Sequence, residues 1–444
     1  MQLKSMFTKY YNTMQKEVGI DTGTMKGMQY LTVFICFLMN MLDGMDVLII
    51  SFTAPAIAKD WQISPGNLGV VFSSGLVGMT VGAIFLAPFA DKIGRKSMML
   101  IAAIVMGTCI YLTSLTTGIQ SLLLLRFLSG LGIGAMLTSS AALTAEYTPN
   151  KSRDFWVSVV IAGYPVGAVF TGMISAEIIA TAGWPHMFEL AGYFTFLALP
   201  ILYFFLSESL DFYIKSGHKN ALHEINKIHA KLDLDKLEIL PEITNEVKEK
   251  IHMSTLLNPF YRKATLQVWT ALFLAFCTLY FLMNWIPKLA SNAGLSMEAA
   301  IYSGTIFNMG AIVGIPAQGY LSGRFGLKRT IGYIFFATAI FMVMFGLFVG
   351  SNAILAILFL LGFGVQGGFV GLYAVATRMY PTQIRSTGLG WAVGAGRVGG
   401  IIGPIVGGLL VAMGLGMTQS FWFFAIPTLL AGIMTMQICS SKIS

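Results

Sequence analysis

Charged residues are scarce in this sequence. Only 11% of its 444 residues are Asp, Glu, Lys or Arg, and 56% are hydrophobic, whereas a soluble domain carries roughly 25% charged residues to keep its surface in water. The chain also lacks alternating strands and turns, and it has no polar linker apart from one central stretch. The composition therefore excludes an ordinary soluble protein and favours a surface that faces lipid.

Cysteine is equally sparse. The four cysteines, Cys36, Cys109, Cys277 and Cys439, lie in apolar stretches, form no CxxC pair and have no histidine nearby at metal-ligand spacing. We therefore expect no disulfide, no metal site and no cofactor. The phosphate-binding Walker loop, the HExxH motif and the nucleophile elbow are also absent, which argues against an enzyme or an ATP-driven pump.

The net charge of +8 is the one property that suggests nucleic acid. A nucleic-acid-binding module gathers its Lys and Arg residues on one face of a soluble domain, but here they fall between apolar stretches. We therefore expect no nucleic-acid partner and attribute the charge to membrane topology.

Apolar stretches long enough to cross a bilayer recur along the chain. We place them at 29–57, 67–90, 97–117, 120–146, 155–180, 186–206, 265–290, 299–322, 329–350, 352–377, 386–413 and 417–439. The pattern predicts an all-α membrane protein with 12 transmembrane helices. Its parts are an N-terminal segment (1–28), a six-helix half (29–207), a central linker (208–263), a second six-helix half (264–440) and a tail (441–444). The first stretch is too long for a signal peptide, so we expect the first helix to be retained.

The positions of Lys and Arg predict the orientation, because cytoplasmic loops retain these residues. With the N-terminus in the cytoplasm, 23 of the 28 fall on that side and only Lys59 and Lys288 fall outside. Arg126, Arg378 and Arg397 lie within or at the ends of spans. We therefore expect both termini in the cytoplasm.

The central stretch is rich in charge. Its run 223–228 predicts a short amphipathic helix. A regulatory domain is the alternative, but some 55 residues without a substantial apolar core favour a cytoplasmic linker between two halves.

An internal repeat supports the two halves. The segment 87–96, between spans 2 and 3, is echoed by 319–328, between spans 8 and 9, so that matching positions differ by 232 in residue number. At the same offset, Pro149, Arg153, Gly130 and Gly132 recur as Pro381, Arg385, Gly362 and Gly364. Two halves related by a parallel repeat place a substrate site at their interface near the bilayer midplane.

These residues resemble the major facilitator superfamily, and the resemblance covers essentially the whole chain. The family's loop between helices 2 and 3 reads G-x-x-x-D-[RK]-x-G-[RK]-[RK]. Here Asp91, Gly94, Arg95 and Lys96 match, and Ala87 replaces the first glycine. The helix 4 pattern R-x-x-x-G-x-G-x-G also matches, over residues 126–134. The resemblance implies a secondary transporter that works by alternating access.

A closer resemblance is to the aromatic acid:proton symporters, which include importers of 4-hydroxybenzoate, benzoate and muconate. Their D-G-x-D motif in helix 1 stands here at 43–46 and is followed by Ala-Pro-Ala at 54–56. Gly183-Trp184 and the Glu-Ser-Leu segment 208–210 also match, although several sugar transporters share these two features. The resemblance implies import of a small organic anion, most specifically an aromatic carboxylate, with protons across the inner membrane.

Three alternatives remain open. One is another symporter, for sugars or other organic acids. A second is a drug:proton antiporter, which the segment Gly163-Tyr-Pro-Val-Gly167 faintly resembles. The third is a transport-inactive sensor, against which the absence of a signalling module counts.

Asp43 and Asp46 are three residues apart, so both carboxylates lie on one face of a helix near the middle of the membrane. A carboxylate at the bilayer centre costs about 3 kcal/mol, so this face is expected to meet a wet cavity or a partner. Because burial and mutual repulsion both hinder ionisation, the pair can hold one proton near neutral pH. We expect a proton-coupling pair; the alternative is a structural pair beside Gly44.

Two arginines are candidates for anion binding. Arg126, in span 4, stays charged when buried, and we expect it to pair with the helix 1 aspartates and to contribute to the substrate site; the alternative is an arginine that snorkels to the surface. Arg397 lies about twelve residues into span 11, and no acid occurs mid-span in the C-terminal half. Its guanidinium suits a substrate carboxylate; the alternatives are backbone carbonyls or an acid of the N-terminal half.

The remaining candidates are of two kinds. Glu146 and Arg378 are expected to form gate salt bridges with Asp91, Arg95, Arg153 or Arg385, and the loop around Gly94 and Lys96 is expected to share this conformational role. Aromatic and amide side chains, chiefly Tyr164, Asn284 and Trp391, are weaker candidates for contact with a substrate ring. The G-x-G-x-x-G match at 394–399 lies inside an apolar span without a preceding strand, so we interpret it as helix packing rather than dinucleotide binding.

Overall fold

The computed structural model of the chain describes residues 24–149, 151–215, 220–240, 253–348, 353–380 and 382–438. The described residues form helices and no strand, and 12 of the helices are long and apolar enough to cross a membrane. The predicted all-α fold with 12 spans is therefore confirmed, and each predicted span boundary lies within four residues of the observed one. The expected N-terminal segment up to residue 23, Pro381, Cys439 and the tail lie outside the described residues.

The N-terminal half contains α2 (Gly27–Asp60), α5 (Arg95–Thr113), α6 (Ile119–Tyr147), α7 (Arg153–Thr181) and α8 (Trp184–Phe205). Its second span is composite and consists of α3 (Pro65–Val81), the π-helical turn η1 (Gly82–Leu86), the 3-10 turn η2 (Ala87–Phe89) and α4 (Ala90–Ile93). The C-terminal half contains α12 (Arg262–Asn292), α13 (Met297–Phe325), α14 (Leu327–Met344) with η3 (Phe345–Phe348), α15 (Ala353–Met379), α16 (Thr382–Ala412) and α17 (Met417–Gln437). The short helices α9 (Leu210–Lys215), α10 (Ala221–Lys231) and α11 (Met253–Leu256) belong to the central stretch.

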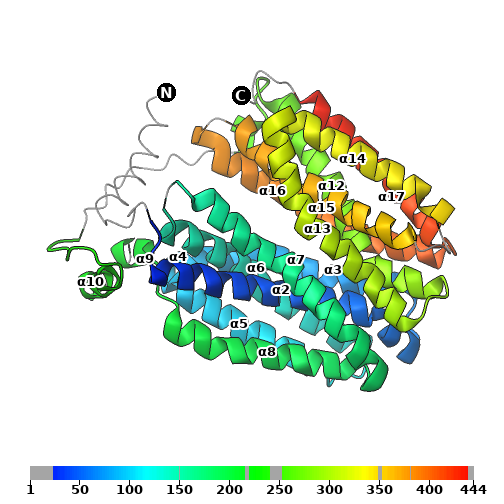
Figure 1. The fold of residues 1–444 in the computed structure, drawn as a ribbon, viewed down its shortest axis with the longest axis horizontal. Coiled ribbons are helices and arrows are strands. Elements are labelled where there is room, and N and C mark those ends of the chain that lie inside the picture. The colour runs from blue at the N-terminus through cyan, green and yellow to red at the C-terminus, as the bar shows by residue number, and fades with distance from the viewer. Residues whose placement is uncertain are drawn as a thin grey trace.

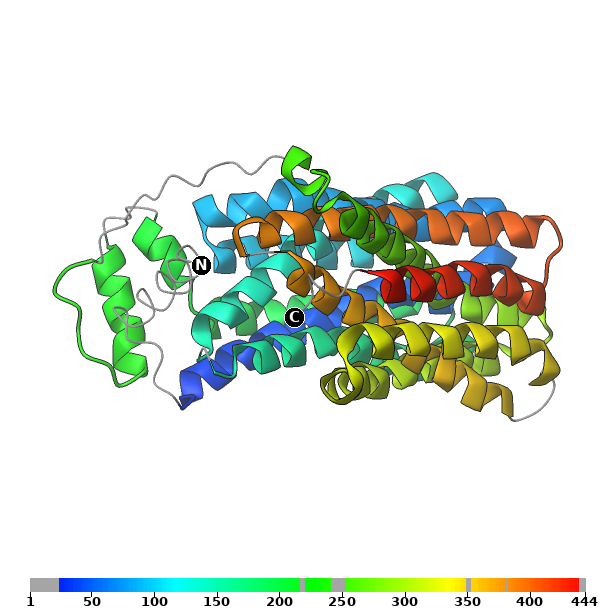
Figure 2. The ribbon, with the colours of Figure 1, turned by 90° about the horizontal axis from the view of Figure 1, so that it is seen from above.

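The two halves form separate bundles that lie side by side, blue to green and yellow to red in Figure 1. Helices α9 and α10 lie beyond the end of the bundle at which α2 begins, as the two views in Figures 1 and 2 show. We call this the linker end, and we call the opposite end, where α2 finishes, the distal end. Helix α10 confirms the predicted helix at 223–228, and its apolar residues Ile225 and Ile228 are buried on one face.

The repeat is visible in the way helices touch. A Cβ atom on Gly78 would stand 2.1 Å from the carbonyl oxygen of Phe127, and at the repeat-related position a Cβ atom on Gly310 would stand 2.0 Å from that of Phe359. The same relation joins three more glycine and carbonyl pairs: Gly82–Leu131 with Gly314–Phe363, Gly130–Gly75 with Gly362–Phe307, and Gly167–Met41 with Gly399–Phe273. Glycine at these positions lets two backbones approach closely, so the repeated glycines set the helix packing of both halves.

The repeated loops also share a backbone shape. Gly94 has a φ of +98° and Gly326, its repeat equivalent, a φ of +88°, a region that favours glycine because it has no Cβ atom. Gly94 has a second constraint, since a Cβ atom there would stand 2.2 Å from Oε2 of Glu208. The Glu208 carboxylate accepts hydrogen bonds from the backbone N–H groups of Lys96 (2.9 Å) and Ser97 (3.4 Å). The first residues after α8 are therefore fixed to the start of α5.

The two halves meet at the distal end. Ser73 Oγ donates a hydrogen bond to the carbonyl oxygen of Ile401 (2.7 Å), and Ser51 Oγ donates to that of Met283 (2.7 Å). All hydrogen bonds between described residues of different halves lie in the distal part of their helices, and no ion pair between described residues joins the halves. The bundle is therefore closed at the distal end in this conformation.

The segment Gly163–Gly167 has a structural explanation. A Cβ atom on Gly163 would stand 2.6 Å from the carbonyl oxygen of Phe37, and one on Gly167 would stand 1.9 Å from that of Met41. The two glycines lie four residues apart on one face of α7 and seat this helix against α2. The segment therefore acts in helix packing, and the structure gives it no role specific to a drug antiporter.

The glycine contacts generate a stability prediction. Gly167→Ala is expected to lower the free energy of unfolding by about 1–3 kcal/mol, the usual cost of overpacking, because its methyl group overlaps Met41 O. The matched control is Gly390→Ala, at a mid-helix position with no atom within 4 Å, which should leave stability unchanged or slightly raised, since alanine is the better helix former by about 1 kcal/mol. Thermal unfolding in detergent, followed with a thiol-reactive dye that labels the buried free cysteines, measures both. Equal melting temperatures for Gly167→Ala and the unmodified protein would contradict the tight contact.

Candidate functional site

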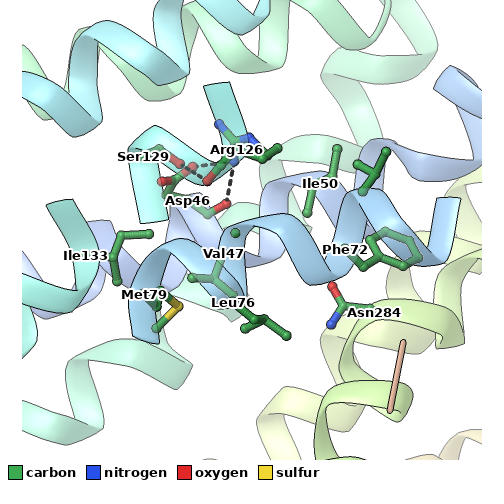
Figure 3. A pocket seen from close by; sticks show the side chains of 12 residues that line it. Asp46, Val47, Ile50, Phe72, Leu76, Met79, Arg126, Ser129, Ile133 and Asn284 are labelled. Atoms are coloured by element: carbon green, nitrogen blue, oxygen red, sulfur yellow. Dashed lines mark hydrogen bonds and ion pairs between the residues drawn. The ribbon is translucent and has the colours of Figure 1, made fainter. Parts of the chain in front are cut away.

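A buried ion pair joins α2 to α6 in the N-terminal half. Arg126 Nη1 lies 2.6 Å from Asp46 Oδ1 and 3.2 Å from the Asp46 carbonyl oxygen, as Figure 3 shows. The side chains are 4% and 0% exposed, and the guanidinium also lies 5.4 Å from the ring centroid of Phe188. Because arginine cannot discharge by losing a proton, it needs this anion inside the membrane. The structure thus gives Arg126 the partner that we expected rather than a place at the surface.

Asp43 lies one helical turn before Asp46 on α2 and is fully buried. Neither of its carboxylate oxygens has a hydrogen-bond partner among the described residues. The helix is packed tightly here, since a Cβ atom on Gly44 would stand 2.0 Å from the carbonyl oxygen of Tyr164. The two aspartates therefore have different surroundings: Asp46 is neutralised by an arginine, and Asp43 has no ionic partner among those residues.

Tyr164 of α7 links this pair to the other half. Its hydroxyl group is buried and has no hydrogen-bond partner among the described residues. It lies within electrostatic range of Asp43 and Asp46 on α2 and of Tyr280 on α12. The structure therefore brings together the expected candidates Asp43, Asp46, Arg126 and Tyr164 at the interface of the halves.

Arg397 lies near the middle of α16 in the C-terminal half and is partly buried. Within the described part of the chain it forms neither an ion pair nor a hydrogen bond. Its guanidinium lies within electrostatic range of the phenol groups of Tyr280 and Tyr373. Arg397 thus stands beside aromatic side chains that the sequence alone did not single out, although their spacing along α12 and α15 was a usable signal.

A small cavity of about 20 Å³ adjoins the ion pair and is bordered by α2, α3, α6 and Asn284 (Figure 3). A volume of this size holds about one water molecule, whereas small-molecule pockets measure roughly 300–1,000 Å³. The cavity is therefore no substrate pocket in this conformation. Asn284 reaches this cavity, and its Nδ2 donates to the carbonyl oxygen of Tyr280 (2.7 Å); contact with a substrate ring stays a prediction.

Trp391 is placed differently from the other candidates. Its side chain is 46% exposed and its ring lies 6.1 Å from that of Trp269 in a stacked arrangement. No described contact joins it to Arg397, to Tyr164 or to the cavity. The structure therefore does not bring Trp391 to the site, because this part of α16 packs its ring against α12.

The linker end holds the residues expected to form a gate. Arg95 forms ion pairs with Glu146 and, at 3.9 Å, with Asp91. Glu146 Oε2 also accepts a hydrogen bond from Ser209 Oγ (2.6 Å), while Lys96 Nζ lies 5.6 Å from the ring centroid of Tyr203. These contacts join α4, α5, α6, α8 and the first residues of the central stretch, and none of them reaches the C-terminal half.

Arg378 and Arg385 form no ion pair with another described residue. The salt bridges that we expected for Arg378 are therefore absent among the described residues in this conformation. The physical reason lies in the composition of their half, because Glu298, at the start of α13, is the only acidic residue from 264 to 444. Arg153, expected to join the same network, begins α7 at the linker end. Any acid at the linker end that pairs with Arg378 or Arg385 must therefore come from the N-terminal half or from the central stretch.

Comparisons with known proteins agree with this architecture. The model of the Major Facilitator Superfamily matches residues 36–318 and 268–438. The chain is 31% identical over 430 residues to the 4-hydroxybenzoate transporter of Acinetobacter baylyi (95% of this chain and 93% of that protein) and 29% identical over 417 residues to the gallate transporter of Pseudomonas putida (93% and 92%). Its fold is similar to the crystal structure of a D-xylose-proton symporter, with a TM-score of 0.73, 18% identity and coverage of 92% of this chain and 97% of that one. The matches span both halves and the linker between them, and the chain belongs to the Major Facilitator Superfamily, a family of membrane transporters and not of enzymes.

Proposed function

We propose that the protein is a proton-coupled symporter that imports a small aromatic carboxylate across the inner membrane. The observation that supports this best is the unequal distribution of charge between the halves. Near mid-membrane the N-terminal half buries two aspartates and one arginine, whereas the C-terminal half places one partly buried arginine and no acid there. The names of relatives, which are transporters of 4-hydroxybenzoate, gallate and benzoate, support an aromatic acid as the substrate.

Arg397 is the proposed anchor for the substrate carboxylate. Its repeat equivalent in the N-terminal half is Pro165, so helix packing in this fold does not require a cation at the position. The guanidinium presents a planar fork that binds a carboxylate through two parallel hydrogen bonds. A polar group in the membrane needs a partner or a wet cavity, and a substrate carboxylate provides the missing anion.

Asp43 is the proposed carrier of the transported proton. Its repeat equivalent is Ala275 and that of Asp46 is Thr278, so the C-terminal half has no second site of this kind. Asp46 is paired with Arg126, while a charged Asp43 without a partner would cost about 3 kcal/mol in the bilayer. Two carboxylates in different environments divide the roles of fixed charge and proton donor. In this conformation Asp43 holds the proton, and release follows when the site is hydrated.

The linker end is the proposed cytoplasmic end. Lys and Arg gather there, while Lys59 and Lys288 lie toward the distal end, a distribution that cytoplasmic loops favour. On this assignment both termini are cytoplasmic and the closed distal end faces outward. Closure at the linker end brings Arg378 and Arg385 toward the acids of the N-terminal half, of which Asp91 is 75% exposed, and this supports a gate role for the loop.

Uptake experiments test the proposed substrate and coupling. In proteoliposomes with an inward proton gradient, the unmodified protein should accumulate labelled 4-hydroxybenzoate. Asp43→Asn should abolish stimulation by the gradient but keep exchange of labelled for unlabelled substrate, because exchange moves no net proton. Arg397→Ala should raise the substrate concentration needed for half-maximal exchange about tenfold to a hundredfold, from the loss of roughly 1.5–3 kcal/mol of charge-assisted hydrogen bonding.

The matched control is Glu298→Gln, which removes an exposed acid at the distal end and should leave both assays unchanged. Gradient-driven accumulation that persists in Asp43→Asn would contradict its role in coupling. If 4-hydroxybenzoate, benzoate and gallate are all refused, the aromatic substrate is wrong and the screen moves to sugars, other organic acids and efflux substrates.

The buried ion pair generates a separate prediction about stability. Arg126→Ala leaves Asp46 charged and alone, and should destabilise the protein by about 3–5 kcal/mol. The double change Asp46→Asn with Arg126→Gln removes both charges and should regain most of the melting temperature without regaining transport. The control is Asp233→Asn, which breaks the exposed pair with Lys26 and should cost no more than about 1 kcal/mol. A double variant as unstable as Arg126→Ala would show that the pair is not what stabilises this region.

A further inference from the structure

We infer that Phe276, Tyr280, Phe369 and Tyr373 form the seat for the substrate ring, and that the phenols of Tyr280 and Tyr373 select ring-hydroxylated acids over the unsubstituted acid. We call these four side chains the ring seat. The inference rests on the proposed function, because it assigns a place and a specificity to the same substrate.

The four rings form one cluster on two helices. Phe276 and Tyr280 lie four residues apart on α12 with stacked rings at a centroid distance of 5.9 Å, and Phe369 and Tyr373 lie four residues apart on α15 at 5.3 Å. Phe276 joins the two pairs, with its ring 4.6 Å from Phe369 and 6.5 Å from Tyr373. Edge and face contacts at these distances are favourable, and a planar ligand ring can extend the cluster in the same way.

The ring seat adjoins the proposed anchor. Cβ atoms on Gly396 and Gly400, which flank Arg397 on α16, would stand 2.5 Å from the Phe276 ring and 3.0 Å from the Tyr280 ring. The rings therefore pack directly on the helix surface beside Arg397. An arginine next to an aromatic cluster matches the two chemical parts of an aromatic carboxylate.

The polar groups of the cluster have no partners in the described part of the protein. The phenols of Tyr280 and Tyr373 lie within electrostatic range of Arg397. Yet neither phenol nor the Arg397 guanidinium forms a hydrogen bond with a described residue. Polar groups at membrane depth are satisfied by protein, by water or by a ligand. Because the phenols are near the cation but not bonded to it, they suit a ligand that carries a carboxylate and a hydroxyl at separate positions of one ring.

The repeat shows that the fold itself does not require these rings. The repeat equivalents of Phe276, Tyr280, Phe369 and Tyr373 in the N-terminal half are Gly44, Leu48, Leu137 and Ala141. That half packs equivalent helices without an aromatic side chain at any of the four positions. The rings are therefore an addition of the C-terminal half, on the same side of the interface as Arg397.

The position of the ring seat also places it opposite the proton site. Tyr280 lies within electrostatic range of Tyr164, which in turn lies within that of Asp43. A ligand on the ring seat would therefore adjoin Arg397 within its own half and face Tyr164 of the other half. A sugar has no aromatic face to pack there, and a cationic drug would be repelled by Arg397, so the arrangement favours an aromatic anion.

Conservative variants test the inference in proteoliposomes. The concentrations of 4-hydroxybenzoate and of benzoate that halve the exchange of labelled 4-hydroxybenzoate give a preference ratio for each protein. Tyr280→Phe and Tyr373→Phe keep the rings and remove the hydroxyl groups, so at least one of them should lower the preference for 4-hydroxybenzoate about fivefold, the loss of about one neutral hydrogen bond. Their affinity for benzoate should stay unchanged. The control is Tyr333→Phe, which alters an exposed phenol of the same half and should keep the ratio of the unmodified protein.

The ring contacts are tested by Phe369→Ala, which should weaken both ligands by a similar factor and leave the ratio unchanged. Stabilisation of the purified protein against heat by each acid provides a second readout, independent of transport. If the unmodified protein binds both acids and both tyrosine variants keep its ratio, the hydroxyl selection is overturned while the proposed function stands. If the unmodified protein is neither stabilised by these acids nor exchanges them, the proposed function fails and the ring seat fails with it.

Discussion

The bilayer sets the constraint on which the rest of this structure depends, because a charge inside it needs a partner or a wet cavity. Asp46 and Arg126 meet this constraint within the protein, with both side chains buried and 2.6 Å between their nearest atoms. Their pairing leaves Asp43, one turn away, as an acid without a counter-charge among the described residues. The ion pair thus occupies the nearby arginine and leaves Asp43 available for the proposed exchange of a proton, since a free arginine nearby would favour its charged form.

The duplicated fold separates what packing needs from what transport needs. Glycines and carbonyls that set helix contacts recur at the constant offset of the repeat, as expected for features that any such half requires. The charged and aromatic residues of the site do not recur: Asp43 corresponds to Ala275, Arg126 to Leu358 and Arg397 to Pro165. This asymmetry is consistent with the proposed division, in which α2 and α6 would handle the proton while α12, α15 and α16 would hold the substrate.

Much of this architecture was predictable from sequence because it rests on one-dimensional signals. Hydrophobic length gave the spans, and the spacing of Asp43 and Asp46 gave their common face. The partner of Arg126 was predictable in kind, since few acids lie in the membrane. The sequence did not predict which aromatic rings lie beside Arg397, because the contact of α12 with α15 depends on helix rotations that composition does not determine. For the same reason, closeness to Arg397 in sequence did not indicate where the Trp391 ring lies, which is against Trp269.

The two ends of the bundle differ in the interactions available for closing them. At the distal end the halves meet through serine hydroxyls on backbone carbonyls and through close glycine packing, as between Gly69 and Pro404, contacts that need no charge and act at short range. At the linker end the C-terminal half offers only cations, Arg378 and Arg385 among them, and the acids lie in the N-terminal half and in the central stretch. Glu146 is engaged by Arg95 in this conformation, whereas Asp91 is largely exposed, so the two acids differ in what the proposed closure of the linker end would have to break. In the proposed transport cycle, a balance between packing at one end and ionic contacts at the other would allow small binding energies at the central site to decide which end is open.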